Sequence, residues 1–208
     1  MSKVQNDGTP GVRGRVTIIR AGALLILAAA ALYGAYWFVS KSSPDSGLKQ
    51  LARGEMSKLV VADKLAPPPP ITAQGPDGRN LTLADLKGQI VVVNLWATWC
   101  APCVKEMPTL AQLQRGYAGR PVKVLAISLD KGAEDIAKAK AFIAAKPPLA
   151  FYHGDYGLAF SVDPPAEGLP TTILYDRSGR ERARLSGGAD WSTPEARVVL
   201  DRLISLHD

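Results

Sequence analysis

An apolar run that leads directly into a pair of cysteines is the feature that most restricts how this chain can fold. Residues 90–95 are almost all Val, Ile or Leu, which is typical of a strand buried on both faces of a sheet. The sequence WCAPC follows at residues 99–103, and apolar residues at helical spacing, such as Met107 and Leu110, come next. This order predicts an α/β domain in which the two cysteines lie where a central strand ends and a helix begins.

The rest of the chain predicts further strands and helices around this unit. Two short strands joined by a turn at residues 75–78 are expected before the central strand. Beyond it we expect strands at residues 122–129 and 149–152, a helix at 134–145, a strand hairpin at 171–175 and 181–185, and a final helix. Ser192 is expected to cap that final helix, because Glu195 follows three residues later. The predicted fold is a central mixed β-sheet flanked by helices.

The spacing of the two cysteines, Cys100 and Cys103, suits redox chemistry better than structural support. A disulfide that closes so short a loop adds little chain-entropy stabilisation. At a helix N-terminus, free N–H groups and the helix dipole favour a thiolate, so we expect the pKa of Cys100 to lie below its ordinary value. Cys100 would attack a partner disulfide, and Cys103 would resolve the mixed disulfide. Pro102 removes an N–H that would lack a partner, and Trp99 offers a flat apolar surface for docking.

A membrane anchor is expected near the N-terminus. Residues 21–39 form an uncharged apolar run, which would span about 28 Å as a helix. Arginines precede the run within residues 1–20, and aromatic residues crowd its far end, so the N-terminus should be cytoplasmic and the rest of the chain outside. A cleaved signal peptide is the alternative, but its apolar region would be shorter and end in small residues.

Between the anchor and the domain we expect a linker. Residues 40–70 contain a possible amphipathic helix and end in four consecutive prolines at 67–70, which favour an extended polyproline conformation. The globular domain is therefore expected to cover residues 71–208.

Charge and histidine content argue against two other classes of function. The net charge of +6 is not gathered into a basic block, so nucleic-acid binding is not indicated. A CxxC pair can be half of a zinc site, but such a site needs four ligands, and His153 and His207 are the only histidines. We therefore expect no metal and no cofactor other than a reversible disulfide between Cys100 and Cys103, with an inert disulfide as the alternative.

Residues 94–103, NLWATWCAPC, and the following KEMP at 105–108 resemble the active-site region of the thioredoxin superfamily. The closer resemblance is to its membrane-anchored, periplasmic TlpA-type branch, and it covers about residues 71–206. Residues 168–172, GLPTT, resemble the loop that carries the cis-proline of the superfamily. The resemblance implies a thioredoxin-like fold, a cis peptide bond before Pro170, and pairing of the Leu169 backbone with an extended client segment.

One departure from the thioredoxin pattern concerns proton transfer. Thioredoxins bury an Asp six residues before the first cysteine, where this chain has Asn94, and the Lys that accompanies it falls on Ala126. An amide does not exchange a proton at working pH, so the usual relay to Cys103 is in doubt. Glu106, one turn beyond Cys103, is the substitute candidate, with an ordinary exposed helix carboxylate as the alternative. Asp130 is expected to be an ordinary loop residue, as is His153.

The resemblance implies a periplasmic reductant tethered to the bacterial inner membrane by a single span. It would receive electrons from a membrane thiol transporter of the DsbD or CcdA kind. Its implied clients are copper-site proteins of cytochrome oxidase assembly. Reduction of apocytochrome c is one alternative, and peroxidase activity is a second. A third is a Cu(I) chaperone that would hold copper on Cys100 and Cys103.

Overall fold

The run predicted as the central strand forms β4 (Ile90–Trp96), and every residue of this strand is buried. β5 (Val122–Ser128) pairs with it in parallel on one side, and β7 (Thr171–Tyr175) pairs antiparallel on the other. The structure is a computed structural model and describes residues 46–206. These described residues form one compact unit.

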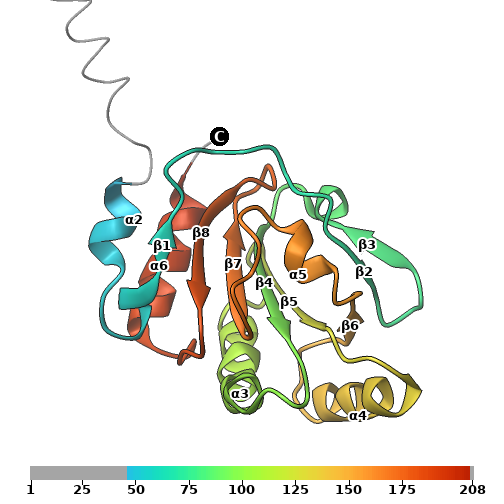
Figure 1. The fold of residues 1–208 in the computed structure, drawn as a ribbon. Helices are drawn as coiled ribbons and strands as arrows, with labels where there is room; N and C mark the ends of the chain where they lie inside the picture. Colours follow the sequence, from blue (N-terminus) through green and yellow to red (C-terminus); the bar gives the residue numbers. More distant parts are fainter. Residues whose placement is uncertain (1–45, 207–208) are drawn as a thin grey trace, which may run out of the picture. The chain divides into compact units, whose positions relative to one another are not determined.

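β4 lies inside an eight-stranded mixed sheet with the order β1-β8-β7-β4-β5-β6-β2-β3 (Figure 1). The other strands are β1 (Val60–Val61), β2 (Thr72–Gln74), β3 (Asn80–Thr82), β6 (Tyr152–His153) and β8 (Glu181–Ser186). β5 and β6 are parallel, and β7 and β8 form the predicted antiparallel hairpin. The predicted mixed sheet is confirmed, although the strand expected at 149–152 is shorter and begins at Tyr152.

Alternate residues of the central strands supply two hydrophobic clusters on opposite faces of the sheet. One face is covered by α3 (Ala101–Gly116), α4 (Ala133–Ala144) and α6 (Pro194–Ser205), and the other by η2 (Leu83–Leu86) and α5 (Leu158–Ser161). On β4, Val92 and Trp96 face the cluster that contains α3, whereas Val93 and Leu95 face the other. Because side chains alternate along a strand, Asn94 shares the α3 face with Val92 and Trp96.

The segment before the proline run is part of the domain, which differs from the linker expected over residues 40–70. α2 (Ser46–Leu51) and η1 (Gly54–Lys58) bring Leu48 and Met56 into the main core, where both are fully buried. β1 then pairs antiparallel with β8 at the edge of the sheet. Burial of each such side chain contributes about 1.5–3 kcal/mol, so this segment belongs to the folded unit.

The proline-rich segment between β1 and β2 spans most of the width of the sheet. It carries the chain from β1 at one edge of the sheet to β2 near the other edge, past six strand spacings (Figure 1). Those spacings amount to roughly 29 Å, and ten residues in a polyproline conformation reach roughly 31 Å. An extended, stiff stretch is therefore what this crossing requires.

The cap of the last helix differs from the prediction. Thr193, not Ser192, is the N-cap of α6, and its Oγ1 accepts a hydrogen bond from the N–H of Ala196. The Ser192 hydroxyl instead donates to Oδ1 of Asp190 at 2.5 Å. Pro194 explains the shift, because it occupies the first helical position and so leaves Thr193 to cap.

Within residues 46–206, no helix is both long and apolar enough to cross a bilayer. The span predicted at residues 21–39 lies outside the described part of the chain.

Candidate active site

The two cysteines lie at the N-terminus of α3. Cys100 is the N-cap residue of this helix and forms a disulfide with Cys103. The backbone N–H of Cys103 donates to Sγ of Cys100 at 3.3 Å. Only 6% of Cys100 and none of Cys103 is exposed. Sγ of Cys100 thus lies where the first turn of the helix favours a thiolate once the disulfide is reduced.

Two exposed side chains flank the disulfide. Trp99 directly precedes Cys100, and 62% of its surface is exposed. Pro102 lies in the first turn of α3, and a Cβ placed on Gly188 would lie 3.4 Å from its Cβ. The loop around Gly188 therefore packs against the dithiol helix, while Trp99 leaves a large apolar surface open beside Cys100.

Leu169 and Pro170 are joined by a cis peptide bond. β7 begins at the next residue and runs antiparallel to β4, with Leu95 opposite Thr171. This register places Pro170 beside the end of β4 from which the chain continues to Cys100. The fold thus brings Pro170 and the two cysteines to the same end of the central strands β4 and β7.

Asn94 of β4 and Glu106 of α3 meet between the central strand and the dithiol helix. Nδ2 of Asn94 donates to Oε1 of Glu106 at 2.7 Å and to Oγ1 of Thr172 at 2.9 Å. The other carboxylate oxygen of Glu106 accepts from the N–H of Ala189 at 3.0 Å. Ala126 is the neighbour of Asn94 on β5, so no basic side chain stands at the position where thioredoxins have a Lys.

The Glu106 side chain is buried, so the alternative of an ordinary exposed carboxylate is wrong. Only 3% of the residue is exposed. Burial raises the pKa of Glu106 to about 7, and the hydrogen bonds from Ala189 and Asn94 oppose that rise. A carboxyl group with such a pKa gains and loses a proton near neutral pH, as an acid or base for thiol chemistry must.

Asp130 is a buried residue and not the ordinary loop residue that the sequence suggested. It follows β5, and 1% of it is exposed. Its Oδ1 accepts a hydrogen bond of 2.6 Å from the hydroxyl of Thr98, and both its carboxylate oxygens lie 3.1 Å from the N–H of Thr98. Oδ2 also accepts from Ser128 Oγ at 2.8 Å. Asp130 therefore holds the loop between β4 and the dithiol.

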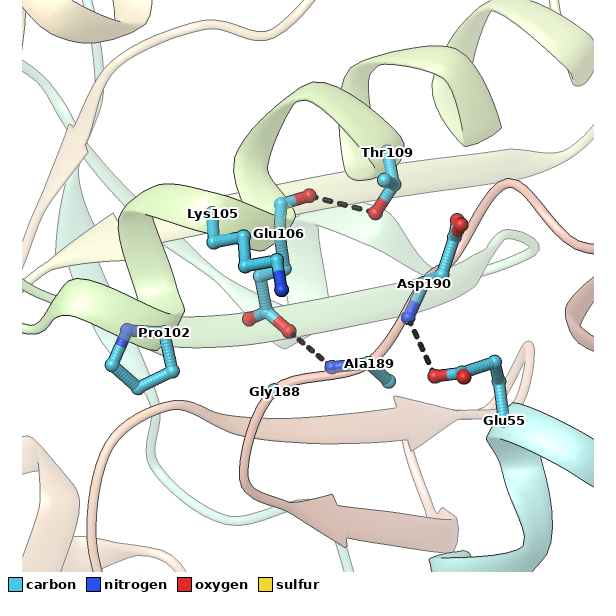
Figure 2. Close-up of a pocket in the computed structure, with 8 residues that line it drawn as sticks. All are labelled: Glu55, Pro102, Lys105, Glu106, Thr109, Gly188, Ala189 and Asp190. Atoms are coloured by element: carbon cyan, nitrogen blue, oxygen red, sulfur yellow. Dashed lines mark hydrogen bonds between the residues drawn. The ribbon is translucent and has the colours of Figure 1, made fainter.

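A pocket of about 440 Å³ lies beside the dithiol helix (Figure 2). Its lining comes from α3, from the loop after β8 and from η1, and the residues are Glu55, Pro102, Lys105, Glu106, Thr109, Gly188, Ala189 and Asp190. Three successive N–H groups of the loop donate to side chains: Ala189 to Glu106, Asp190 to Glu55 and Trp191 to Thr109. No sequence signal pointed to this loop or to Glu55, because backbone donors that bind distant side chains leave no local pattern.

Within residues 46–206, no group of three or more His, Cys, Asp or Glu side chains is placed to hold a metal ion. His153, considered as a possible copper ligand, has its Nε2 2.9 Å from the backbone oxygen of Asp130 and its ring stacked on Phe151. His207 lies outside the described residues.

Comparisons with known proteins agree with this geometry. The model of the AhpC/TSA family matches residues 65–188. The thiol-disulfide oxidoreductase ResA of Bacillus thuringiensis (strain Al Hakam) is 36% identical over an alignment of 115 residues, and the match covers 53% of this chain and 62% of that protein. The chain thus matches less than two thirds of the length of this relative.

Two solved structures are similar in fold. A DsbF homologue from Corynebacterium diphtheriae has 27% sequence identity and a TM-score of 0.58, with 72% of this chain and 94% of that chain covered. The thioredoxin domain of a thiol-disulfide oxidoreductase from Bacteroides vulgatus has 25% identity and a TM-score of 0.54, with 64% and 96% covered. The predicted thioredoxin-like α/β fold is confirmed.

Proposed function

The chain belongs to the AhpC/TSA family, and on this premise we propose that it is a thiol–disulfide oxidoreductase that reduces disulfides in protein clients. The observation that carries the proposal is the disulfide between Cys100 and Cys103 at the N-terminus of α3. A dithiol in this position has a stabilised thiolate and a resolving thiol one turn away. Relatives named thiol-disulfide oxidoreductase ResA support the same chemistry.

The reaction consists of two exchanges. The Cys100 thiolate attacks one sulfur of the client disulfide, so that a mixed disulfide forms and one client thiolate leaves. The Cys103 thiolate then attacks Sγ of Cys100, which forms the Cys100–Cys103 disulfide and releases the second client thiolate. Two electrons pass to the client, and the protein must afterwards be reduced by another dithiol. No cofactor takes part.

Glu106 is proposed to accept the proton of Cys103 before the second exchange. The two residues are three positions apart on one face of α3, which puts their Cβ atoms about 5–6 Å apart. With a pKa raised by burial to about 7, Glu106 is partly ionised near neutral pH and can hold that proton. Asn94 positions the carboxylate through its 2.7 Å hydrogen bond.

The client is proposed to bind across Trp99 and the loop at Leu169. Trp99 supplies exposed apolar surface, and the backbone of Leu169, next to the cis bond, would pair with an extended client segment. Pro102, beside this surface, also lines the pocket of Figure 2.

We further propose a periplasmic location, with residues 21–39 as an uncleaved anchor in the bacterial inner membrane and the N-terminus in the cytoplasm. A membrane thiol transporter of the DsbD or CcdA kind would supply the electrons. The TlpA-type resemblance of residues 94–108 supports clients that carry copper-site cysteines for cytochrome oxidase assembly, and apocytochrome c is the alternative client. Topology reporters fused after residue 41 and after residue 208 test the location.

The oxidoreductase proposal is tested by trapping. A Cys103→Ser variant of the reduced chain should form a stable mixed disulfide with a disulfide-bonded client, whereas a Cys100→Ser variant should form none. If the Cys100→Ser variant traps clients equally well, the assignment of the nucleophile is overturned. Hydrogen peroxide and Cu(I) are offered in parallel: rapid oxidation by peroxide would favour a peroxidase, and stoichiometric copper binding would favour a chaperone.

A further inference from the structure

Asp130 makes a set of contacts that its place in a loop does not require. Its carboxylate is almost fully buried and accepts hydrogen bonds from the N–H and hydroxyl of Thr98 and from the hydroxyl of Ser128. All of these donors are neutral. Burying a carboxylate costs free energy, and among the described residues only neutral groups donate to this one, so the role of these contacts is worth tracing.

The position of Thr98 in the chain indicates what Asp130 does. Residues 97–100 form a turn, in which the N–H of Cys100 donates to the oxygen of Ala97 at 3.1 Å. Thr98 lies inside this turn, two residues before the nucleophile, and is held by Asp130 at two separate donors. The strand ladder ends just before it, where Leu129 N–H donates to the oxygen of Trp96 at 2.8 Å. After that bond, the contacts of Thr98 with Asp130 connect the turn to the segment that follows β5.

We propose that Asp130 is a positioning residue for the dithiol: its carboxylate anchors Thr98 and thereby fixes the turn that presents Cys100 to the N-terminus of α3. The proposal rests on the proposed function, because it assigns a cause for the reactivity of the same nucleophile. Asp130 touches neither sulfur and acts only through the backbone of residues 97–100.

The position of Cys100 relative to the N-terminus of α3 affects the stability of its thiolate. The thiolate of Cys100 is stabilised by the N–H of Cys103 and by the helix dipole, and both effects decay within the first turn. Without Asp130, the N–H and hydroxyl of Thr98 lose their acceptors and the turn is free to move. Sγ of Cys100 would then spend less time near the N–H of Cys103, and the thiolate would be less stable.

The direct charge of Asp130 acts in the opposite sense. A negative carboxylate near a thiolate disfavours it, so removal of that charge alone would make Cys100 more acidic. Anchoring and charge therefore predict opposite changes in the same measurement. We expect the loss of anchoring to have the larger effect on the pKa of Cys100.

The experiment measures the pH dependence of Cys100 alkylation in the reduced full-length chain, in a Cys103→Ser background. In Asp130→Ala the midpoint should rise, and below the midpoint the alkylation rate should fall roughly three- to tenfold, because the rate follows the thiolate fraction. Thr98→Val, which removes only the hydroxyl, should shift the midpoint in the same direction by less. Asp130→Asn, which keeps one acceptor oxygen, should restore part of the rate.

Asp176 supplies a control for the loss of a buried carboxylate far from the dithiol. It is 3% exposed and accepts from the N–H groups of Ser178 and Arg180. Unlike Asp130, it also pairs with the guanidinium groups of Arg180 and Arg182, at 3.0 and 3.3 Å, and it lies after the end of β7 farthest from Pro170. Asp176→Asn should lower stability and leave the midpoint unchanged. An unchanged or lower midpoint in Asp130→Ala overturns the proposal. If Asp130→Ala does not fold, Thr98→Val and Asp130→Asn decide by the same criterion.

A second measurement is equilibration of the two-cysteine chain with glutathione. The reduced form loses thiolate stabilisation in Asp130→Ala, so the equilibrium should move toward the disulfide, by a factor of roughly three to ten. A tenfold change corresponds to about 30 mV. Both measurements use small thiol reagents, so they remain valid if no protein client is reduced and the oxidoreductase proposal fails.

Discussion

Asn94 donates a 2.7 Å hydrogen bond from its side-chain amide to Oε1 of Glu106, and both side chains are buried between β4 and α3. The bond joins the central strand to the dithiol helix one turn beyond Cys103. Where thioredoxins have an Asp on the strand, this chain has an amide on the strand and its carboxyl group on the helix. The buried acidic group is therefore on the helix in this chain and on the strand in thioredoxins.

Glu106 should make the stability of the oxidised protein depend on pH. Its pKa is about 7 in the folded protein, against an ordinary value of 4.5, so between these values the folded state holds a proton that the unfolded state has lost. The contribution of Glu106 to stability is therefore fully present below this window and falls by roughly 3 kcal/mol as the pH rises through it. Urea unfolding of Glu106→Gln should show this decline removed; an unaltered decline would assign it to another group.

The rate of thiol–disulfide exchange should rise with pH, whereas the contribution of Glu106 to stability falls. If the Glu106 carboxylate accepts the proton of Cys103, the rate of the second exchange should rise with pH through about 7. Glu106→Gln should lower that rate by roughly 100-fold, at the lower end of general base effects, and should prolong the life of the mixed disulfide. Stopped-flow measurement of the second exchange tests this, and an equal rate in both proteins would exclude Glu106 as the base.

Asn94→Asp should place two carboxyl groups at the 2.7 Å contact with Glu106. Because like charges this close do not both ionise readily, the pair should titrate in two steps, with the upper apparent pKa above about 7. The carboxyl absorption of the infrared spectrum, followed over pH, measures both steps. Thr172→Val is the control, since it removes the other partner of the Asn94 amide and adds no charge; it should leave a single step for Glu106.

The segment before the proline run should contribute to global stability. Met56 on η1 is fully buried in the main core, so Met56→Ala should lower the free energy of unfolding by about 2–5 kcal/mol. Val60, four residues later, is 64% exposed, and Val60→Ala should change it by less than about 0.5 kcal/mol. Denaturant unfolding compares the two, and similar small effects would show that the segment is dispensable.

The features of this protein that can be predicted from its sequence depend on residues close together in the chain. The apolar run at residues 90–95 predicted β4, the WCAPC stretch predicted the start of α3, and two short runs around the turn residues 176–179 predicted the β7–β8 hairpin. Strand and helix periods and turn residues act between near neighbours, so they can be read from one chain. The same locality explains why the spacing of the two cysteines and their place between strand and helix were enough to indicate redox chemistry.

Tertiary structure decided the surroundings of the dithiol. Glu106 is buried because the loop after β8, 83 residues away in sequence, closes over it, and Asp130 reaches Thr98 across 32 residues. Met56 lies in the core because η1 packs against α6 and β8, elements from the far end of the chain. Hydrogen bonds and burial between residues so far apart depend on how the whole sheet assembles, and no periodic pattern along the chain records them.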